Sequence, residues 1–185
     1  MRLFIGIPLA TTAMQEVAAL LTHLRSRVRG QLSEQLRWPA PEAWHITLQF
    51  LGSTTTEQYA CVVKRLGEVR HASLPIELSG VGTFERTGVF FVGVQLSPEL
   101  LTFQQVITAA TRPCGFPAED RPYRPHITLA RRKRSSHSDE WRSLTSGAHP
   151  PLRSSFIADN FVLYESIPSP DGSRYTPREQ FALEG

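Results

Sequence analysis

The 185-residue chain contains only two cysteines and has no long hydrophobic run. Cys61 and Cys114 form no CxxC pair and have no companion histidine cluster, so we expect two reduced thiols in a reducing compartment. No stretch reaches the ~20 apolar residues that a membrane-spanning helix needs. The apolar start at residues 3–8 contains Gly6 and Pro8 and precedes no small-residue cleavage site, which favours a buried strand over a signal peptide. We therefore expect a cytoplasmic protein, a monomer by default, that has no membrane partner.

The sequence also lacks the common signatures of cofactor, metal and nucleophile chemistry. It contains no P-loop and no GxGxxG segment, so neither ATP nor a dinucleotide is required. It contains no HExxH, no His/Cys cluster with zinc spacing and no GxSxG nucleophile motif. We therefore expect no cofactor and no metal.

Lysine is scarce, since only Lys64 and Lys133 among the 20 basic side chains are lysines. Arginine binds phosphate through two parallel hydrogen bonds, so this bias suits an RNA or nucleotide ligand, although a codon preference explains scattered arginines equally well. One basic group is concentrated, because residues 126–129 are flanked by Arg121, Arg124, Arg131, Arg132, Lys133 and Arg134. The last three form either an outer patch that attracts phosphate or a solvated loop.

A repeated tetrapeptide is the most specific feature that the chain does contain. HITL stands at residues 45–48 and again at residues 126–129. In an extended strand, side chains two residues apart share a face, so each copy places one imidazole beside one hydroxyl. The alternative is a duplicated core strand that carries histidine for packing. Packing explains the Ile and Leu of each copy, but it does not explain two polar side chains on the opposite face.

Hydrophobic periodicity predicts an α+β chain in which each half has a helix before its HITL strand. Two capping-box patterns predict helix starts, at Thr12 with Gln15 and at Thr54 with Glu57, and a Ser-Pro pair predicts a third start at residue 97. We expect helices over residues 12–30, 54–70 and 97–111. We expect strands over residues 3–8, 36–38, 44–51, 76–84, 89–96, 126–130, 156–157, 161–167 and 181–183. The polar segment 132–152 is the best candidate for a mobile insertion.

Two imidazoles and two hydroxyls that face one cleft suit acid–base chemistry on a phosphate. One histidine takes a proton and the other gives one, while the threonines hold the phosphate oxygens. The residues alone do not say which histidine is the acid.

The paired His-x-Thr motifs and their flanks resemble the two-histidine (2H) phosphoesterase superfamily. Within it, the likeness is to the bacterial LigT-like RNA 2′,3′-cyclic phosphodiesterases, also called 2′-5′ RNA ligases. The resemblance covers nearly the whole chain and rests on RLFIGIPL at the start, WHITLQFLG at 44–52, GVGTF and GVFFVGV within 80–94, RPHITLAR at 124–131, FVLYESI at 161–167 and GSRYTP at 172–177. Trp44 departs from the smaller residue of many relatives and leaves the motif intact.

The resemblance implies one domain over residues 1–185, made of two pseudo-symmetric lobes whose antiparallel sheets line a central cleft with helices outside. It implies metal-independent hydrolysis of RNA 2′,3′-cyclic phosphate ends to 2′-phosphomonoesters. By analogy His45 is the proton donor and His126 the proton acceptor. Thr47 and Thr128 then bind the non-bridging phosphate oxygens, and Arg131 adds positive charge.

Aromatic residues in segments expected near the cleft are candidates for stacking on a nucleobase. These are Phe84, Phe91 and Tyr123, although aromatic side chains more often fill the core. The sequence leaves the function open between hydrolysis, 2′-5′ RNA ligation as the reverse reaction, and a non-catalytic nucleotide- or RNA-binding module. The expected partner is RNA or a nucleotide with a 2′,3′-cyclic phosphate, tRNA fragments included.

Overall fold

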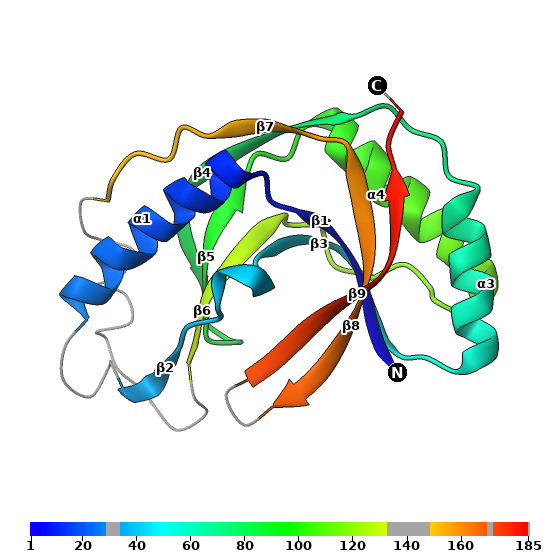
Figure 1. Ribbon diagram of the computed structural model, residues 1–185, viewed down its shortest axis with the longest axis horizontal. Helices are drawn as coiled ribbons and strands as arrows, with labels where there is room; N and C mark the ends of the chain where they lie inside the picture. Colours follow the sequence, from blue (N-terminus) through cyan, green and yellow to red (C-terminus); the bar gives the residue numbers. More distant parts are fainter. Residues whose placement is uncertain (29–33, 133–148, 170–171, 185) are drawn as a thin grey trace.

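Two antiparallel sheets make up the centre of the protein, seen in a computed structural model that describes residues 1–28, 34–132, 149–169 and 172–184. The four-stranded sheet has the order β3-β1-β8-β9 and the five-stranded sheet has the order β2-β6-β5-β4-β7 (Figure 1). Their strands are β1 (Arg2–Pro8), β2 (Leu36–Arg37), β3 (His45–Ser53), β4 (Leu74–Phe84), β5 (Val89–Val94), β6 (His126–Arg132), β7 (Ser155–Ala158), β8 (Asn160–Ser169) and β9 (Gly172–Ala182). The predicted α+β class is confirmed.

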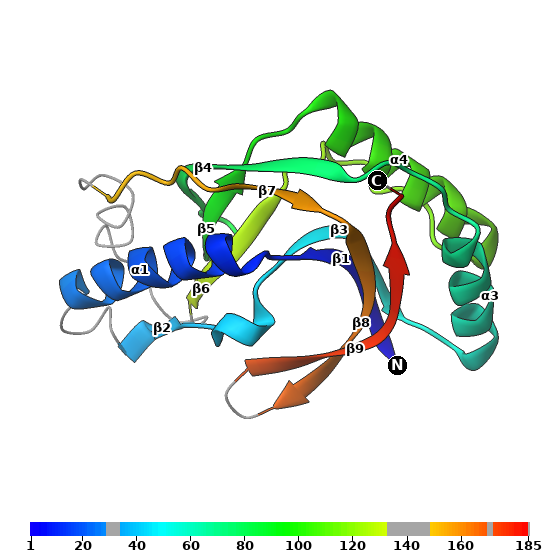
Figure 2. The same cartoon turned by 45° about the horizontal axis from the view of Figure 1, so that its top comes forward.

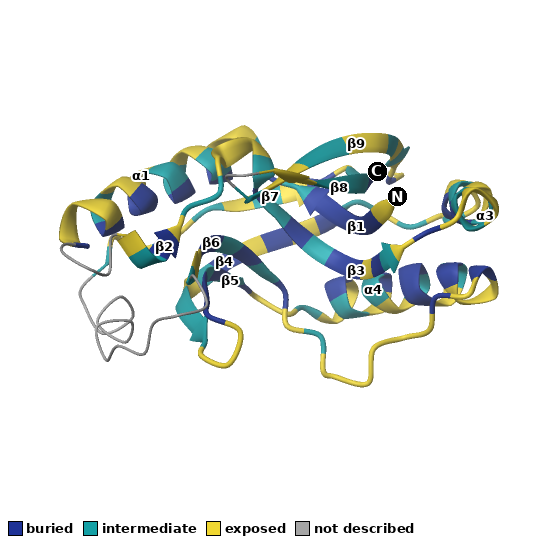
Figure 3. Cartoon of the chain, turned by 90° about the horizontal axis from the view of Figure 1, so that it is seen from below, coloured by how far each residue is buried: buried dark blue, intermediate teal, exposed yellow. Residues whose placement is uncertain are grey.

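Helices on opposite sides of the molecule cover these sheets. Helix α1 (Thr11–Arg27) contacts β7 of the five-stranded sheet, whereas α3 (Thr56–Gly67) contacts β9 and α4 (Pro98–Thr111) contacts β3 of the four-stranded sheet (Figures 1 and 2). Short 3₁₀ turns, η1 (Pro41–Ala43) and η2 (Arg112–Cys114), precede the two segments that lead into the HITL strands. The buried positions of α1 face the strands and its exposed positions face outward (Figure 3), as expected for an amphipathic helix.

The helix starts agree with the predicted capping in one case and differ in two. Ser97 accepts a hydrogen bond from the Leu100 amide and Pro98 follows it, as predicted for α4. At α3 a capping box is present, but it joins Thr55 and Gln58 one residue later than predicted. The box predicted at the start of α1 is wrong, because that helix begins after Ala10 without a side-chain cap.

The strand predictions hold except at the C-terminal end. The predicted hairpin of residues 76–96 is present, since β4 and β5 pair through a turn that follows Phe84. Strand β9, predicted only over residues 181–183, extends back to Gly172 and pairs with β8 along its length. Its polar sequence and Pro177 conceal the strand, and its place at the sheet edge tolerates the missing amide donor.

Cys61 on α3 and Cys114 in η2 form a disulfide, so the expectation of two free thiols is wrong. The pair is separated by 53 positions and becomes adjacent only when α3 packs beside η2. Sequence spacing carries no sign of this tertiary contact. In the described part of the chain, no helix is both long and apolar enough to cross a membrane. Most of the predicted insertion at 132–152, and the predicted helix end at Gly30, lie outside the described residues.

Candidate active site

The two HITL strands belong to different sheets and lie against each other. Strand β3 is the edge strand of the four-stranded sheet, and β6 lies second from the edge of the five-stranded sheet. Contacts between β3 and β6 join the sheets (Figure 2). His45 and His126 are each the first residue of their strand. The fold therefore brings together the four predicted His and Thr residues, two from each sheet.

His45 has a ring tautomer that is set by its neighbours. Its Nδ1 lies 2.8 Å from the carbonyl oxygen of Ala43, and because a carbonyl can only accept, Nδ1 carries the hydrogen. Its Nε2 lies 3.1 Å from Oγ1 of Thr47. In the neutral imidazole the Thr47 hydroxyl therefore donates to Nε2, and the predicted His-Thr pair is a direct contact.

His126 is held in the same way but keeps a free nitrogen. Its Nδ1 donates to the carbonyl oxygen of Arg124 at 2.8 Å. Among the residues that the structure describes, none forms a hydrogen bond with its Nε2. The two histidines thus share the tautomer with the hydrogen on Nδ1, and of the two only His126 has an Nε2 lone pair that no described residue occupies.

The electrostatic setting favours the neutral form of both rings. Burial lowers the pKa of His45 to about 4, with smaller lowering contributions from the charges of His126 and Arg131, while the Ala43 carbonyl opposes the shift. Burial and the Arg131 charge also lower the pKa of His126. One guanidinium, that of Arg131, therefore acts electrostatically on both histidines.

Aromatic rings from three strands surround His45 and account for its burial. Its ring centroid lies 4.5 Å from that of Phe4, 5.1 Å from that of Tyr175 and 5.8 Å from that of Tyr164. Gly6 leaves the space that the imidazole occupies, because an added Cβ there would lie 3.0 Å from the Ile46 oxygen and 3.3 Å from Cδ2 of His45. The sequence reasoning missed these residues, whose signal was the RLFIGIPL, FVLYESI and GSRYTP segments.

His126 packs against two of the three aromatic residues predicted to bind a base. Phe84 and Phe91 lie with ring centroids 4.9 and 5.3 Å from that of His126 and 4.4 Å from each other. The Phe91 ring packs against Gly82, where an added Cβ would come within 2.7 Å of it. Both rings are half-buried supports of the imidazole, and their predicted role in stacking stays a prediction.

Tyr123, the third candidate, connects the two half-sites. Tyr123 lies in the loop that leads to His126, and its hydroxyl donates to the main-chain oxygen of Thr47 at 3.0 Å. Burial raises the pKa of its phenol, so the hydroxyl keeps its proton. Tyr123 therefore fixes the distance between the β3 and β6 motifs.

A β-bulge in β6 turns Arg131 toward the site. Phe91 pairs with Thr128 and Phe90 pairs with Ala130, so Leu129 is the extra residue. Leu129 and Ala130 are both buried, after which Arg131 emerges exposed. Strict alternation from His126 would place residue 131 on the opposite face, and the bulge restores it to the face of the histidine and threonine.

The other residues of the predicted basic group do not form one patch with Arg131 in the described part of the chain. Arg132 packs on Gly88 and donates to the main-chain oxygen of Glu85 at 3.4 Å, so it supports the β4–β5 turn. Arg121 forms an exposed ion pair with Glu119. Lys133 and Arg134 lie outside the described residues.

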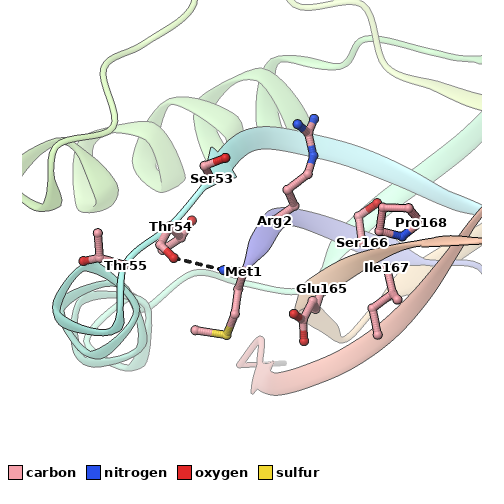
Figure 4. A pocket seen from close by; sticks show the side chains of 9 residues that line it. All are labelled: Met1, Arg2, Ser53, Thr54, Thr55, Glu165, Ser166, Ile167 and Pro168. Atoms are coloured by element: carbon pink, nitrogen blue, oxygen red, sulfur yellow. Dashed lines mark hydrogen bonds between the residues drawn. The ribbon is translucent and has the colours of Figure 1, made fainter.

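A cavity of about 470 Å³ lies at the far end of β1 and β3 from His45. Its lining includes Arg2, Thr55 and Glu165, and the amino group of Met1 donates to Thr54 there (Figure 4). Pairing of Arg2 with Ser53 at one end of these strands, and of Pro8 with His45 at the other, separates the cavity from the histidines. Within the described ranges, no group of three or more His, Cys, Asp or Glu side chains is arranged to hold a metal ion.

Comparison with known protein families matches this chain to one superfamily. The model described as the 2′-5′ RNA ligase superfamily matches residues 13–167. An RNA 2′,3′-cyclic phosphodiesterase of Archaeoglobus fulgidus is 30% identical over 180 residues, which cover 95% of this chain and 96% of the relative. An enzyme of the same name from Geobacillus stearothermophilus is 32% identical over 171 residues and 88% of this chain, which spans about half of that relative (51%).

Solved structures show the same arrangement of the chain. Escherichia coli LigT in its apo form superimposes with a TM-score of 0.79 at 26% identity, covering 100% of this chain and 98% of that one. LigT complexed with 3′-AMP gives a TM-score of 0.78 at 26% identity over 98% and 97% of the two chains. The predicted LigT-like fold is therefore confirmed.

Proposed function

The chain belongs to the 2′-5′ RNA ligase superfamily, and on that premise we propose that it hydrolyses the 2′,3′-cyclic phosphate at an RNA 3′ end to a 2′-phosphomonoester. The observation that carries the proposal is the pair of histidines, each with Nδ1 donating to a carbonyl, that two sheets present together. Such a pair provides one acid and one base for a single displacement at phosphorus. The named relatives act as RNA 2′,3′-cyclic phosphodiesterases, which supports the same reaction here.

In the proposed reaction, Nε2 of His126 takes a proton from water as the water oxygen bonds to phosphorus. The bond between phosphorus and the ribose 3′-oxygen breaks, and Nε2 of His45 gives its proton to that oxygen. The product is a 3′-hydroxyl beside a 2′-phosphate. The lone pair on Nε2 of His126, to which none of the described residues hydrogen-bonds, supports its role as base. No metal or cofactor takes part in this proposal.

The acid role of His45 requires an imidazolium, which its pKa of about 4 in the free protein opposes. The bound phosphate supplies a negative charge beside the ring, and an opposite charge within about 4 to 6 Å raises a histidine pKa. Substrate binding thus protonates His45 at the moment when an acid is needed. The hydroxyls of Thr47 and Thr128 bind the non-bridging oxygens, and Arg131 stabilises the added charge of the phosphorane.

We extend the proposal to short RNAs and tRNA fragments as substrates of a monomeric, cytoplasmic enzyme. The disulfide removes one ground for this location, the two free thiols, so fractionation of cells that express the chain is the measurement that tests it.

Product analysis of an RNA oligonucleotide with a 2′,3′-cyclic phosphate end tests the reaction and its direction. The oligonucleotide alone is expected to gain one water and yield a 2′-phosphate, identified by mass and by the linkage of the phosphate. In a second incubation, a strand with a 5′-hydroxyl is added, because the family description also includes ligation. Accumulation of a 2′-5′ joined product in preference to the hydrolysed end would replace the hydrolase proposal with ligation. Binding of the oligonucleotide without any turnover would instead favour a non-catalytic RNA-binding module.

A further inference from the structure

We propose that Arg37 binds a second phosphate of the substrate, the phosphodiester that joins the cyclic-phosphate nucleotide to the rest of the RNA strand on its 5′ side. The inference rests on the proposed function, because it adds a subsite next to the phosphate that reacts. Arg37 is not part of the basic group expected around residues 126–129, since it lies in β2, before the first histidine. The subsite would make an RNA strand a better substrate than a mononucleotide.

The pairing of β2 places Arg37 beside Arg131. These two residues are directly opposite each other in the antiparallel pair of β2 and β6, and Leu36 is opposite Arg132. Residues that are directly opposite point to the same face of a sheet, with Cβ atoms about 4.5 to 5.5 Å apart. Arg37 therefore shares the face of the five-stranded sheet on which the bulge of β6 places Arg131.

The residues on either side of Arg37 fix its direction. Leu36 is 5% exposed, and Trp38 packs against the hydrophobic core. The guanidinium carbon of Arg25 on α1 lies over the Trp38 ring, 5.5 Å from its centre. Because side chains alternate along an extended chain, two inward neighbours turn Arg37 outward, where it is exposed.

The segment that carries Arg37 connects the two half-sites. From Arg37 the chain runs through η1 into β3, and the Ala43 carbonyl of η1 accepts the hydrogen bond from Nδ1 of His45 (Figure 2). The same segment pairs with β6, the strand that begins with His126. Arg37 is thus built into the site from the segment before one histidine and the strand of the other.

Two exposed cations on facing positions favour an anion between them. Like charges that are directly opposite on neighbouring strands are destabilising. Among the described residues, none forms an ion pair or a side-chain hydrogen bond with the guanidinium of Arg37 or Arg131. A cyclic phosphodiester carries one negative charge, which one guanidinium already matches. A second phosphate on the substrate supplies the anion that the second guanidinium lacks.

The level of Arg37 along the sheet suits the next phosphate of a strand. Its partner Arg131 follows Thr128 by three residues, and one of these is the bulge residue Leu129. A strand rises by about 3.3 Å per residue, so this level lies roughly 7 to 10 Å beyond the hydroxyl proposed to hold the reacting phosphate. One sugar separates successive phosphates of a strand. A nucleotide that ends in a 2′,3′-cyclic phosphate is joined to its strand only through its 5′-oxygen, so the second phosphate is on the 5′ side.

The test compares Arg37→Gln on two substrates that differ only in a 5′-phosphate. These are adenosine 2′,3′-cyclic phosphate and its 5′-phosphorylated form, whose 5′-phosphate stands for the phosphodiester of the strand. On the 5′-phosphorylated substrate we expect kcat/KM to fall about tenfold, mainly through KM, because a charge-assisted hydrogen bond to phosphate is lost. On the other substrate we expect no change. Arg37→Lys keeps the charge without the planar fork and should lose less.

Arg65→Gln is the matched control. It removes one exposed cation from α3, away from β2, and should change neither rate (Figure 1). An equal loss on both substrates in Arg37→Gln would place the residue at the reacting phosphate and overturn the inference. The absence of a loss on either substrate would overturn it too.

A binding measurement keeps the inference separate from the proposed function. Arg37→Gln is expected to weaken the affinity for adenosine 2′,5′-bisphosphate about tenfold and to leave that for 2′-AMP unchanged. If the wild type turns over neither substrate but this difference in binding holds, the proposed function fails and the subsite stands. If wild type and variant bind the bisphosphate equally well, the subsite fails whatever the turnover.

Discussion

The hydroxyl of Tyr123 donates to the main-chain oxygen of Thr47 at 3.0 Å, and it ties the loop before His126 to the strand that carries His45. A reaction that needs an acid and a base on opposite sides of one phosphorus atom depends on this separation, since small displacements of reacting groups are costly. Tyr123 is therefore a positioning residue.

Tyr123→Phe removes that hydroxyl while keeping the ring. We expect a loss of about 1 kcal/mol in the free energy of unfolding and a lower kcat with a nearly unchanged KM. Tyr59→Phe is the matched control, because the Tyr59 hydroxyl donates to Glu179 at 2.8 Å away from the site. Urea unfolding and steady-state kinetics of both variants check this. An unchanged kcat in Tyr123→Phe would limit the residue to a structural role.

Gly6 is predicted to be necessary for the position of His45. In Gly6→Ala the added Cβ meets the Ile46 oxygen at 3.0 Å and the imidazole at 3.3 Å, so the ring must shift. A shift of this kind is expected to lower kcat/KM by about tenfold or more. Gly80→Ala is the control, because no atom lies within 4 Å of a Cβ at that position. If both variants keep wild-type kinetics, the close packing of Gly6 does not position the histidine.

The pH dependence of the reaction follows from the two lowered histidine pKa values. In the proposed mechanism the active form has one neutral and one protonated imidazole, and both pKa values lie below the ordinary 6.5. We therefore expect a bell-shaped profile of kcat/KM with its maximum below pH 6.5 and a fall of about tenfold per pH unit above it. Arg131→Met removes a cation that lowers both values, so it should move the alkaline limb to higher pH. A flat profile from pH 5 to 8 contradicts this two-histidine description.

The disulfide is predicted to stabilise the fold rather than the chemistry. Closing a loop with a sequence separation of 53 restricts the unfolded chain by about 4 kcal/mol in the loop-entropy description. The double variant Cys61→Ala with Cys114→Ala should therefore unfold at a lower urea concentration. Wild type treated with dithiothreitol should match it. An unfolding midpoint that is insensitive to reduction would show that the bond does not form in solution.

The site could be predicted from sequence where local rules determine it. Alternation within a strand was enough to pair His45 with Thr47 and His126 with Thr128, and the Ser97-Pro98 pattern placed α4. Features that depend on a neighbouring strand were not accessible. Because a bulge is defined by the register of two strands, the direction of Arg131 appears only after β6 pairs with β5.

Contacts between distant elements were also beyond the sequence. Cys61 and Cys114 meet because α3 packs beside η2, and spacing alone suggested two thiols. Tyr175 reaches His45 from β9, a strand whose polar sequence gave no clear alternation. The lowered pKa of each histidine likewise comes from burial in the assembled site, which the repeated tetrapeptide does not record.

The most direct test of the central claim is the single-turnover rate of cyclic-phosphate hydrolysis in EDTA for wild type, His45→Ala and His126→Ala. If the two histidines are the acid and the base, the wild type forms 2′-phosphate in the presence of EDTA. Each alanine variant, folded as judged by circular dichroism, is then slower by about 10² to 10⁴-fold. Full activity in either variant, or wild-type activity that is lost in EDTA and restored by zinc, would contradict the account.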